Sequence, residues 1–299
     1  MRKALAPFVT TRDPKGRKFL SVVTAAYDKA ALSEDEAQRV NEAPGLAELV
    51  GRFIADNRQT NRFEEEEVES SYTYPQEYKG PKPIEAQIRA IAKIFDPDPS
   101  HALEYAKNLP QLPGGAEGWF AIPSVEALAT EHFPEVTDLA EKYCRAVQLV
   151  HQKIAASRKF YNYREGQITP SQLRIHARTA NALDLIAETQ KGDILIVAAQ
   201  LGIRHRGRSV RRAREVFVVN EFGLGSLAVG SIILTHPERL VRWEQLHMDC
   251  AGDEFSPGAD DRFERAPYFR FYVDGVGFDT RWAGSADGYY GSVSGFLPQ

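Results

Sequence analysis

An arginine run between Ile203 and Glu215 is the part of this sequence with the clearest chemical potential. It reads I-R-H-R-G-R-S-V-R-R-A-R-E. Guanidinium groups form paired hydrogen bonds with phosphate or carboxylate oxygens and keep their charge at neutral pH. The run therefore predicts an anion site for a phosphate-bearing ligand. Its candidate ligand-binding residues are Arg204, His205, Arg206, Arg208, Arg211, Arg212 and Arg214.

Two local geometries would gather these arginines on one surface. In an extended segment, side chains of equal parity point to one face. That parity is shared by Arg204, Arg206, Arg208, Arg212 and Arg214. If a helical turn starts at Ser209 instead, Arg208, Arg211 and Arg212 cluster. In either geometry the arginines could also pair with the chain's own carboxylates, for example those of Asp249, Asp253 and Glu254.

A second group of reactive side chains lies between His247 and Glu254. Histidine, thiol and carboxylate groups so close together could transfer protons or form a nucleophile with its base. The candidate catalytic residues are His247, Asp249, Cys250, Asp253 and Glu254. Their spacing matches no established metal or calcium motif, so no metal is predicted and a solvated turn is the alternative interpretation.

A third group combines cations and aromatic rings at the end of a long predicted helix. Its residues are Arg158, Lys159, Tyr161, Tyr163 and Arg164. Bases of single-stranded nucleic acids stack on aromatic rings beside basic grooves, so this group is a secondary candidate site. Aromatic rings at a helix end can equally fill a core.

The glycine-rich stretches predict turns and no cofactor. Gly223, Gly225 and Gly230 lack both the lysine of a phosphate-binding loop and the glycine order of a dinucleotide site. Gly291 to Gly295 has valine where a nucleophile elbow would place serine.

Composition limits the partners that these groups could have. With 37 basic and 41 acidic residues the net charge is -4, so any attraction to nucleic acid must be local. Cys144 and Cys250 are far apart in sequence and predict free thiols in a reducing cytosol. The N-terminal residues do not resemble a secretory signal, and no apolar run approaches the roughly 20 residues that span a bilayer. We therefore expect a soluble cytoplasmic protein.

Helices dominate the first two thirds of the sequence. Phe19 to Leu32 has apolar residues at mixed helical spacing, and Ser33 with Glu36 matches a capping box. Apolar residues from Pro44 to Asn57 follow the spacing of one buried helical face. Glu64 to Glu67 and the proline-rich stretch after Ser70 predict an exposed connector.

Further helices are expected after this connector. Their ranges are Ile84 to Phe95, Ser100 to Leu109, Ser124 to His132, Thr137 to about Phe160, and Thr169 to Lys191. Ser124 and Thr137 are predicted caps, and Thr169-Pro170-Ser171-Gln172 is a predicted helix start. Gly192 is expected to end the last helix in the left-handed conformation.

Strands are expected from Asp193 onward. Asp193 to Ala199 is a short apolar run typical of a strand buried on both faces. Glu215 to Asn220 and Leu227 to Leu234 have the same signature. Tyr268 to Val273, the turn Asp274-Gly275 and Val276 to Trp282 predict a hairpin.

Together these elements predict an α+β fold, with a helical N-terminal and central part packed on a mostly antiparallel C-terminal sheet. The expected segments are 1–69 (helical), 70–83 (connector), 84–192 (helical) and 193–299 (strand-rich), and 84–299 can form a single domain. The leading hypothesis is a binding protein for a phosphate-bearing ligand, foremost nucleic acid. The alternatives are a hydrolase or transferase acting on a phosphorylated substrate, and a structural or assembly protein with the arginine run in internal ion pairs. A protein partner is a separate alternative for the arginine run.

Overall fold

The computed structural model describes residues 14–43, 45–46, 49–51, 53–54, 61–260 and 262–298. Contacts divide the chain into two compact units, Met1–Arg58 and Gln59–Gln299. Each unit is described by itself. In the part of the chain that the structure describes, no helix has the length and apolar composition needed to cross a membrane.

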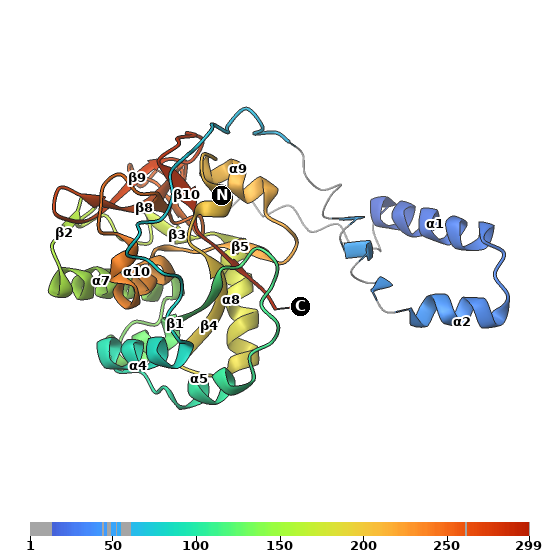
Figure 1. Ribbon diagram of the computed structural model, residues 1–299, viewed down its shortest axis with the longest axis horizontal. Coiled ribbons are helices and arrows are strands. Elements are labelled where there is room, and N and C mark those ends of the chain that lie inside the picture. The colour runs from blue at the N-terminus through green and yellow to red at the C-terminus, as the bar shows by residue number, and fades with distance from the viewer. Residues whose placement is uncertain are drawn as a thin grey trace. The chain divides into compact units, whose positions relative to one another are not determined.

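The first unit contains the helices α1 (Pro14–Lys29) and α2 (Glu34–Glu42), joined by a short turn (Figure 1). The predicted capping box is confirmed, because the Ser33 backbone N–H donates to Glu36 Oε2 at 2.9 Å. In the predicted helix from Pro44 to Asn57, residues 46, 49–51 and 53–54 are helical. The remaining positions of that helix lie outside the described residues or in a turn.

A smaller sheet forms one layer of the second unit. Its order is β1 (Gly118–Pro123), β4 (Ile194–Gln200), β11 (Ser294–Phe296) and β5 (Glu221–Gly223), and all its pairs are antiparallel. Every residue of β4 is buried. The apolar run after Asp193 is therefore the buried strand that the sequence predicts.

A larger sheet forms the other layer. The strands β10 (Tyr290–Ser292), β6 (His247–Asp249), β8 (Arg265–Tyr272), β7 (Asp253–Phe255) and β3 (Leu173–Ile175) follow one another. The strand β9 (Gly275–Trp282) pairs with β8 and with β2 (Phe160–Asn162). The predicted hairpin is confirmed, with Tyr272 opposite Gly275. The two sheets are mostly antiparallel, so the fold is α+β.

The helices of this unit cover and separate the sheets (Figure 1). They are α4 (Ile84–Phe95), α5 (Ser100–Tyr105), α6 (Val125–His132), α7 (Leu139–Ser157), α8 (Ala177–Gln190), α9 (Val210–Val216) and α10 (Ser226–Thr235). Single 3-10 turns form η1 (Ala106–Asn108), η2 (Ile203–His205) and η3 (Pro237–Arg239). The helix α10 contacts α7, β1 of the smaller sheet and β8 of the larger sheet, so the main core lies around it.

The strand predicted from Leu227 to Leu234 is wrong, because these residues belong to α10. Nearly all of α10 is buried, so its sequence is apolar on every side. A helix of this kind has no polar face and therefore no 3.6-residue period that would distinguish it from a buried strand. The strand predicted from Glu215 to Asn220 is wrong too, since α9 extends to Val216 and β5 begins only at Glu221.

Two predicted helix starts are also shifted. Asp138, not Thr137, caps α7, because its carboxylate accepts from the Glu141 N–H at 2.9 Å. Thr169 closes a local turn with the Leu173 N–H donating to its carbonyl at 2.8 Å, and the chain then enters β3. The predicted cap at Ser124 is confirmed by its bond from the Ala127 N–H at 3.1 Å.

The end of α8 gives a first prediction. Lys191, rather than Gly192, adopts the left-handed conformation there, with φ of 50°. Glycine adopts this conformation without the steric cost of a Cβ, so Lys191→Gly should raise the free energy of unfolding by about 1 kcal/mol. Urea denaturation measures the change. Gly192→Ala is the opposite control, because its Cβ would lie 2.9 Å from His101 Cβ and should destabilise the protein. A lower stability of Lys191→Gly would contradict the prediction.

Candidate functional site

The arginine run adopts the helical alternative of the two predicted geometries. The 3-10 turn η2 is followed by a bend at Gly207, where φ is +77°, and Ser209 then caps α9. The Ser209 hydroxyl accepts from the Arg212 N–H at 3.1 Å. A Cβ on Gly207 would lie 2.1 Å from the Val68 carbonyl oxygen, so only glycine fits there.

The acidic run, predicted to be an exposed connector, is bound to these arginines. Glu66 accepts from Ser209 Oγ at 2.6 Å and from Arg211 Nε at 2.7 Å. Glu67 pairs with Arg212 and, at 3.2 Å, with Arg208. The exposed fractions of the Glu66 and Glu67 side chains are only 16% and 33%. Burial alone would raise the pKa of both carboxyl groups. The hydrogen bonds and charges of the arginines lower the pKa by more than burial raises it, so both groups stay ionised.

His205 lies inside the domain, where it binds Glu221. Its Nε2 is 2.6 Å from Glu221 Oε1, and its Nδ1 is 3.2 Å from Arg208 Nη1. Because a guanidinium can only donate, Nδ1 must accept and Nε2 carries the proton donated to Glu221. Burial lowers the pKa of His205 despite this carboxylate. His205 is therefore a neutral structural link with both ring nitrogens occupied.

The other arginines of the run also have internal partners. Arg206 donates to the Tyr72 carbonyl at 3.1 Å. Arg214 donates to the Ala251 and Asp253 carbonyls at 2.9 and 2.6 Å. Arg204 Nε lies 3.4 Å from Glu221 Oε1, and 35% of the Arg204 side chain is exposed. A phosphate ligand at this run would have to compete with these internal partners.

The predicted catalytic group is divided between two strands and a turn. His247 and Asp249 lie on β6, Cys250 follows them, and Asp253 and Glu254 lie on β7. All except Glu254 are buried. Among the described residues, no group of three or more histidine, cysteine or acidic side chains is placed to hold a metal ion.

Each acid of this group has a structural partner. Asp249 pairs with Arg281 at 3.2 Å, and Glu254 pairs with Arg174 at 2.8 Å. Asp253 accepts from the Ser226 N–H at 2.6 Å, at the start of α10. Burial raises the pKa of Asp249 and of Asp253 to about 6.

The two remaining members of the group are inert in their surroundings. Burial raises the pKa of the Cys250 thiol well above its usual value, which disfavours the nucleophilic thiolate. Burial also lowers the pKa of His247 to about 4. The contacts of Asp249, Asp253 and Glu254 therefore stabilise the fold.

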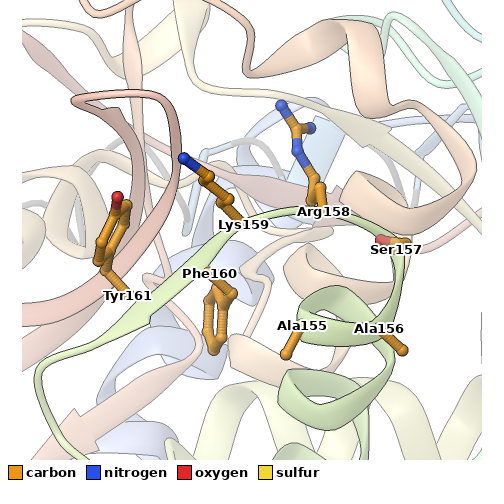
Figure 2. A pocket seen from close by; sticks show the side chains of 7 residues that line it. All are labelled: Ala155, Ala156, Ser157, Arg158, Lys159, Phe160 and Tyr161. Carbon is orange, nitrogen blue, oxygen red and sulfur yellow. The ribbon is translucent and has the colours of Figure 1, made fainter.

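The basic and aromatic group lies where α7 ends and β2 begins. Figure 2 shows Arg158, Lys159 and Tyr161 on one side of the chain and Phe160 on the other. A surface pocket of about 530 Å³ is lined by residues 155 to 161. Arg158 donates to the Pro237 and Leu240 carbonyls at 2.9 and 2.7 Å.

Two acids of the hairpin formed by β8 and β9 partner Lys159, Tyr161 and Arg164. Lys159 pairs with Asp274, and Tyr161 donates to the same carboxylate at 2.6 Å. Arg164 pairs with Asp279 at 2.6 Å. The cations that line the pocket are therefore occupied, and the carbonyl end of α7 carries a negative partial charge. The pocket itself is poorly suited to a phosphate.

The pairing of β2 with β9 and of β9 with β8 places further residues beside this group, on one face of the larger sheet. Tyr161 is opposite Gly277, and Gly277 is opposite Arg270. The Tyr272 ring lies 6.1 Å from that of Tyr161 and 6.0 Å from that of Tyr163, both in edge-to-face contact. The exposed fractions of Tyr163 and Tyr272 are 46% and 37%. We call Tyr161, Tyr163, Tyr272 and Arg270 the tyrosine–arginine patch.

Arg270 differs from the arginines of the run. Its guanidinium carbon lies 4.5 Å from the ring centre of Tyr272 and 5.6 Å from that of Tyr268. It forms no ion pair with a carboxylate in the described part of the chain. Tyr268, Arg270 and Tyr272 alternate along one strand, so their shared face could have been found from sequence. Their position beside Tyr163 depends on the parallel pairing of β2 with β9, which the sequence does not indicate.

Comparison of the chain with known protein families, with characterised proteins and with solved structures found no match.

Proposed function

We propose that this protein binds single-stranded nucleic acid through the tyrosine–arginine patch. The observation that carries the proposal is Arg270, which stacks on Tyr272 at 4.5 Å and has no carboxylate partner among the described residues. Exposed aromatic rings beside an unpaired guanidinium are the elements with which proteins stack bases and contact phosphates. The ligand class is the one that the sequence suggests, whereas the site combines Tyr161 and Tyr163 of the secondary group with Tyr272 and Arg270 and does not include the arginine run.

The shape of the patch favours single strands over duplexes. Its Tyr163 and Tyr272 rings lie on a sheet face, contact each other edge to face and are 46% and 37% exposed, so both are accessible to an unpaired base. Bases of a duplex are already stacked on each other and cannot reach such rings. A cytosolic location belongs to the same proposal, since Cys144 and Cys250 are both buried free thiols.

Titration of fluorescently labelled single-stranded RNA, single-stranded DNA and duplex DNA at low salt tests this proposal. We expect both single strands to bind more tightly than the duplex. Tyr163→Leu and Tyr272→Leu should each weaken binding about ten-fold, because loss of a base–ring stack costs about 1–3 kcal/mol. Tyr163→Phe and Tyr272→Phe keep the rings and should bind nearly normally. Arg270→Leu should reduce both the affinity and its salt dependence.

Two variants outside the patch complete the test. Arg89→Leu removes an exposed arginine of α4 and should leave binding unchanged. Arg204→Gln changes an arginine of the run that is 35% exposed and pairs with Glu221 rather than with Glu66 or Glu67. An absence of binding at low salt would refute the proposal. So would equal losses in the leucine and phenylalanine variants.

A structural or assembly role is the second candidate function. It is favoured by the internal pairing of Arg208, Arg211 and Arg212 with Glu66 and Glu67. These pairs join segments about 145 positions apart in the sequence. This role predicts that none of the three nucleic acids binds in the titration above.

A further inference from the structure

The helix α1 has an apolar stripe that its own unit does not cover. Phe19, Leu20, Val23 and Tyr27 recur at the three- and four-residue spacing of one helical face. The exposed fractions of Leu20, Val23 and Tyr27 are 45%, 47% and 38%. No residue of α1 is buried.

The residues after α2 also expose apolar side chains at helical spacing. Leu46, Leu49 and Ile54 lie at the spacing that predicts one buried helical face, yet their exposed fractions are 46%, 63% and 46%. Regular apolar periodicity is typical of a face that is covered in the working protein. Exposed apolar surface of this extent marks an interaction site.

The charges of the hairpin α1–α2 indicate what covers this surface. Lys15, Arg17 and Lys18 lie in the first turns of α1, and Glu34, Asp35 and Glu36 form the first turn of α2. Counted over each whole helix, α1 has Lys15, Arg17, Lys18 and Lys29 against Asp28, and α2 has Glu34, Asp35, Glu36 and Glu42 against Arg39. The two helices therefore carry opposite charges of equal size.

The basic and acidic ends cannot meet within one hairpin. The chain reverses between Lys29 and Glu34, so the acidic first turn of α2 follows the end of α1 at the same end of the hairpin (Figure 1). The basic start of α1 is then about 20 Å away, since a helix rises 1.5 Å per residue. Among the described residues, Lys15, Arg17 and Lys18 form no ion pair.

We infer that two copies of the chain associate through this hairpin about a two-fold axis, with their α1 helices antiparallel. In this arrangement the start of α1 in one copy lies beside the turn of the other, where α2 begins. The basic end of each copy then meets the acidic end of its partner, twice by symmetry. The stripe of Phe19, Leu20, Val23 and Tyr27 faces its equivalent and is covered. The inference does not depend on the ligand of the larger sheet.

Sedimentation equilibrium of the full chain across the micromolar range tests the association. We expect a monomer–dimer equilibrium that weakens with salt. The double variant Leu20→Glu/Val23→Glu should dimerise at least about ten-fold more weakly, because it would bury like charges at the stripe. Lys79→Glu/Lys93→Glu, which changes exposed lysines of the second unit, should dimerise normally.

Exchange of the charges at the start of α1 and at the start of α2 tests the antiparallel orientation of the two α1 helices. Lys15→Glu/Lys18→Glu and Glu34→Lys/Asp35→Lys should each dimerise about ten-fold more weakly alone, since like charges then meet at both ends. An equimolar mixture of the two variants should recover the association of the natural protein. A chain that stays monomeric throughout, or a mixture that fails to recover, would overturn the inference. Protection of Leu20 and Val23 from hydroxyl-radical labelling in a monomeric chain would do so too, because the cover would then lie within one chain.

Discussion

Acidification from about pH 7 to about pH 5 should lower the free energy of unfolding by about 5 kcal/mol. Burial lowers the pKa of His151 to about 3, and that of His176, His236 and His247 to about 4. These imidazoles are neutral in the fold but bind protons in the unfolded chain near pH 6.5. The stability that they contribute is present above pH 6.5 and is lost as the pH falls. Each accounts for a loss of about 2 kcal/mol at pH 5.

Two buried carboxyl groups oppose this loss. Burial raises the pKa of Asp249 and of Asp253 to about 6. In the fold they take up protons before they do so in the unfolded chain, so between about pH 6 and pH 4 they stabilise the fold as the pH falls. Each regains about 1.3 kcal/mol, which leaves the net loss stated above. Urea denaturation at a series of pH values measures the balance.

A variant of His151 tests whether buried histidines, rather than a general sensitivity to acid, cause this loss of stability. Both of its ring nitrogens lack a hydrogen-bond partner in the described structure, and Phe160, Phe269 and Phe278 surround it. His151→Phe should therefore fold and should remove about 2 kcal/mol of the acid loss. His101→Asn, at an exposed position, should leave the pH dependence as it is. An unchanged slope for His151→Phe would show that this imidazole is not the cause.

Local patterns are sufficient for several elements of this fold. The strand β4 and the hairpin of β8 and β9 follow from apolar runs and a two-residue turn, which involve neighbours in sequence only. The helix α10 could not be recognised, because its burial on all sides removes the polar face that reveals helical periodicity. Its helical state is decided by packing against α7 and both sheets, which no local pattern contains.

The sequence identifies many of the residues of the candidate sites, but it does not identify the residues that they contact. The arginine and acidic runs are both evident in the sequence, yet a local pattern of charged residues does not show which distant residue each of them pairs with. Glu66 and Arg211 are 145 positions apart, and their contact exists only in the folded chain. The sequence does show Tyr161 and Tyr163 as candidates. It cannot show that Tyr272 and Arg270 extend them, because that depends on the parallel pair of β2 and β9.

Removal of the Glu221 carboxylate should destabilise the protein by about 3–5 kcal/mol, because it breaks a buried charge network from one side. Glu221 is fully buried and accepts from His205 at 2.6 Å and from Ser294 Oγ at 2.6 Å. Burial would raise the pKa of Glu221, but these bonds and the charge of Arg204 lower it. Glu221→Ala leaves the imidazole of His205, the hydroxyl of Ser294 and the charge of Arg204 without this partner.

Two milder variants give the matched comparison. Glu221→Gln keeps the volume and one acceptor oxygen, and should cost about half as much. Ser294→Ala should cost about 2 kcal/mol, since it removes the bond that Ser294 Oγ donates to Glu221 and the bond that it accepts from Gln200 Nε2, which keeps its bond to the Ser292 carbonyl. Urea denaturation at neutral pH gives all three values. If Glu221→Ala costs no more than Ser294→Ala, the carboxylate is not the centre of the network. The folded Glu221→Gln variant should also bind nucleic acid as the natural protein does, because the tyrosine–arginine patch lies on the other sheet.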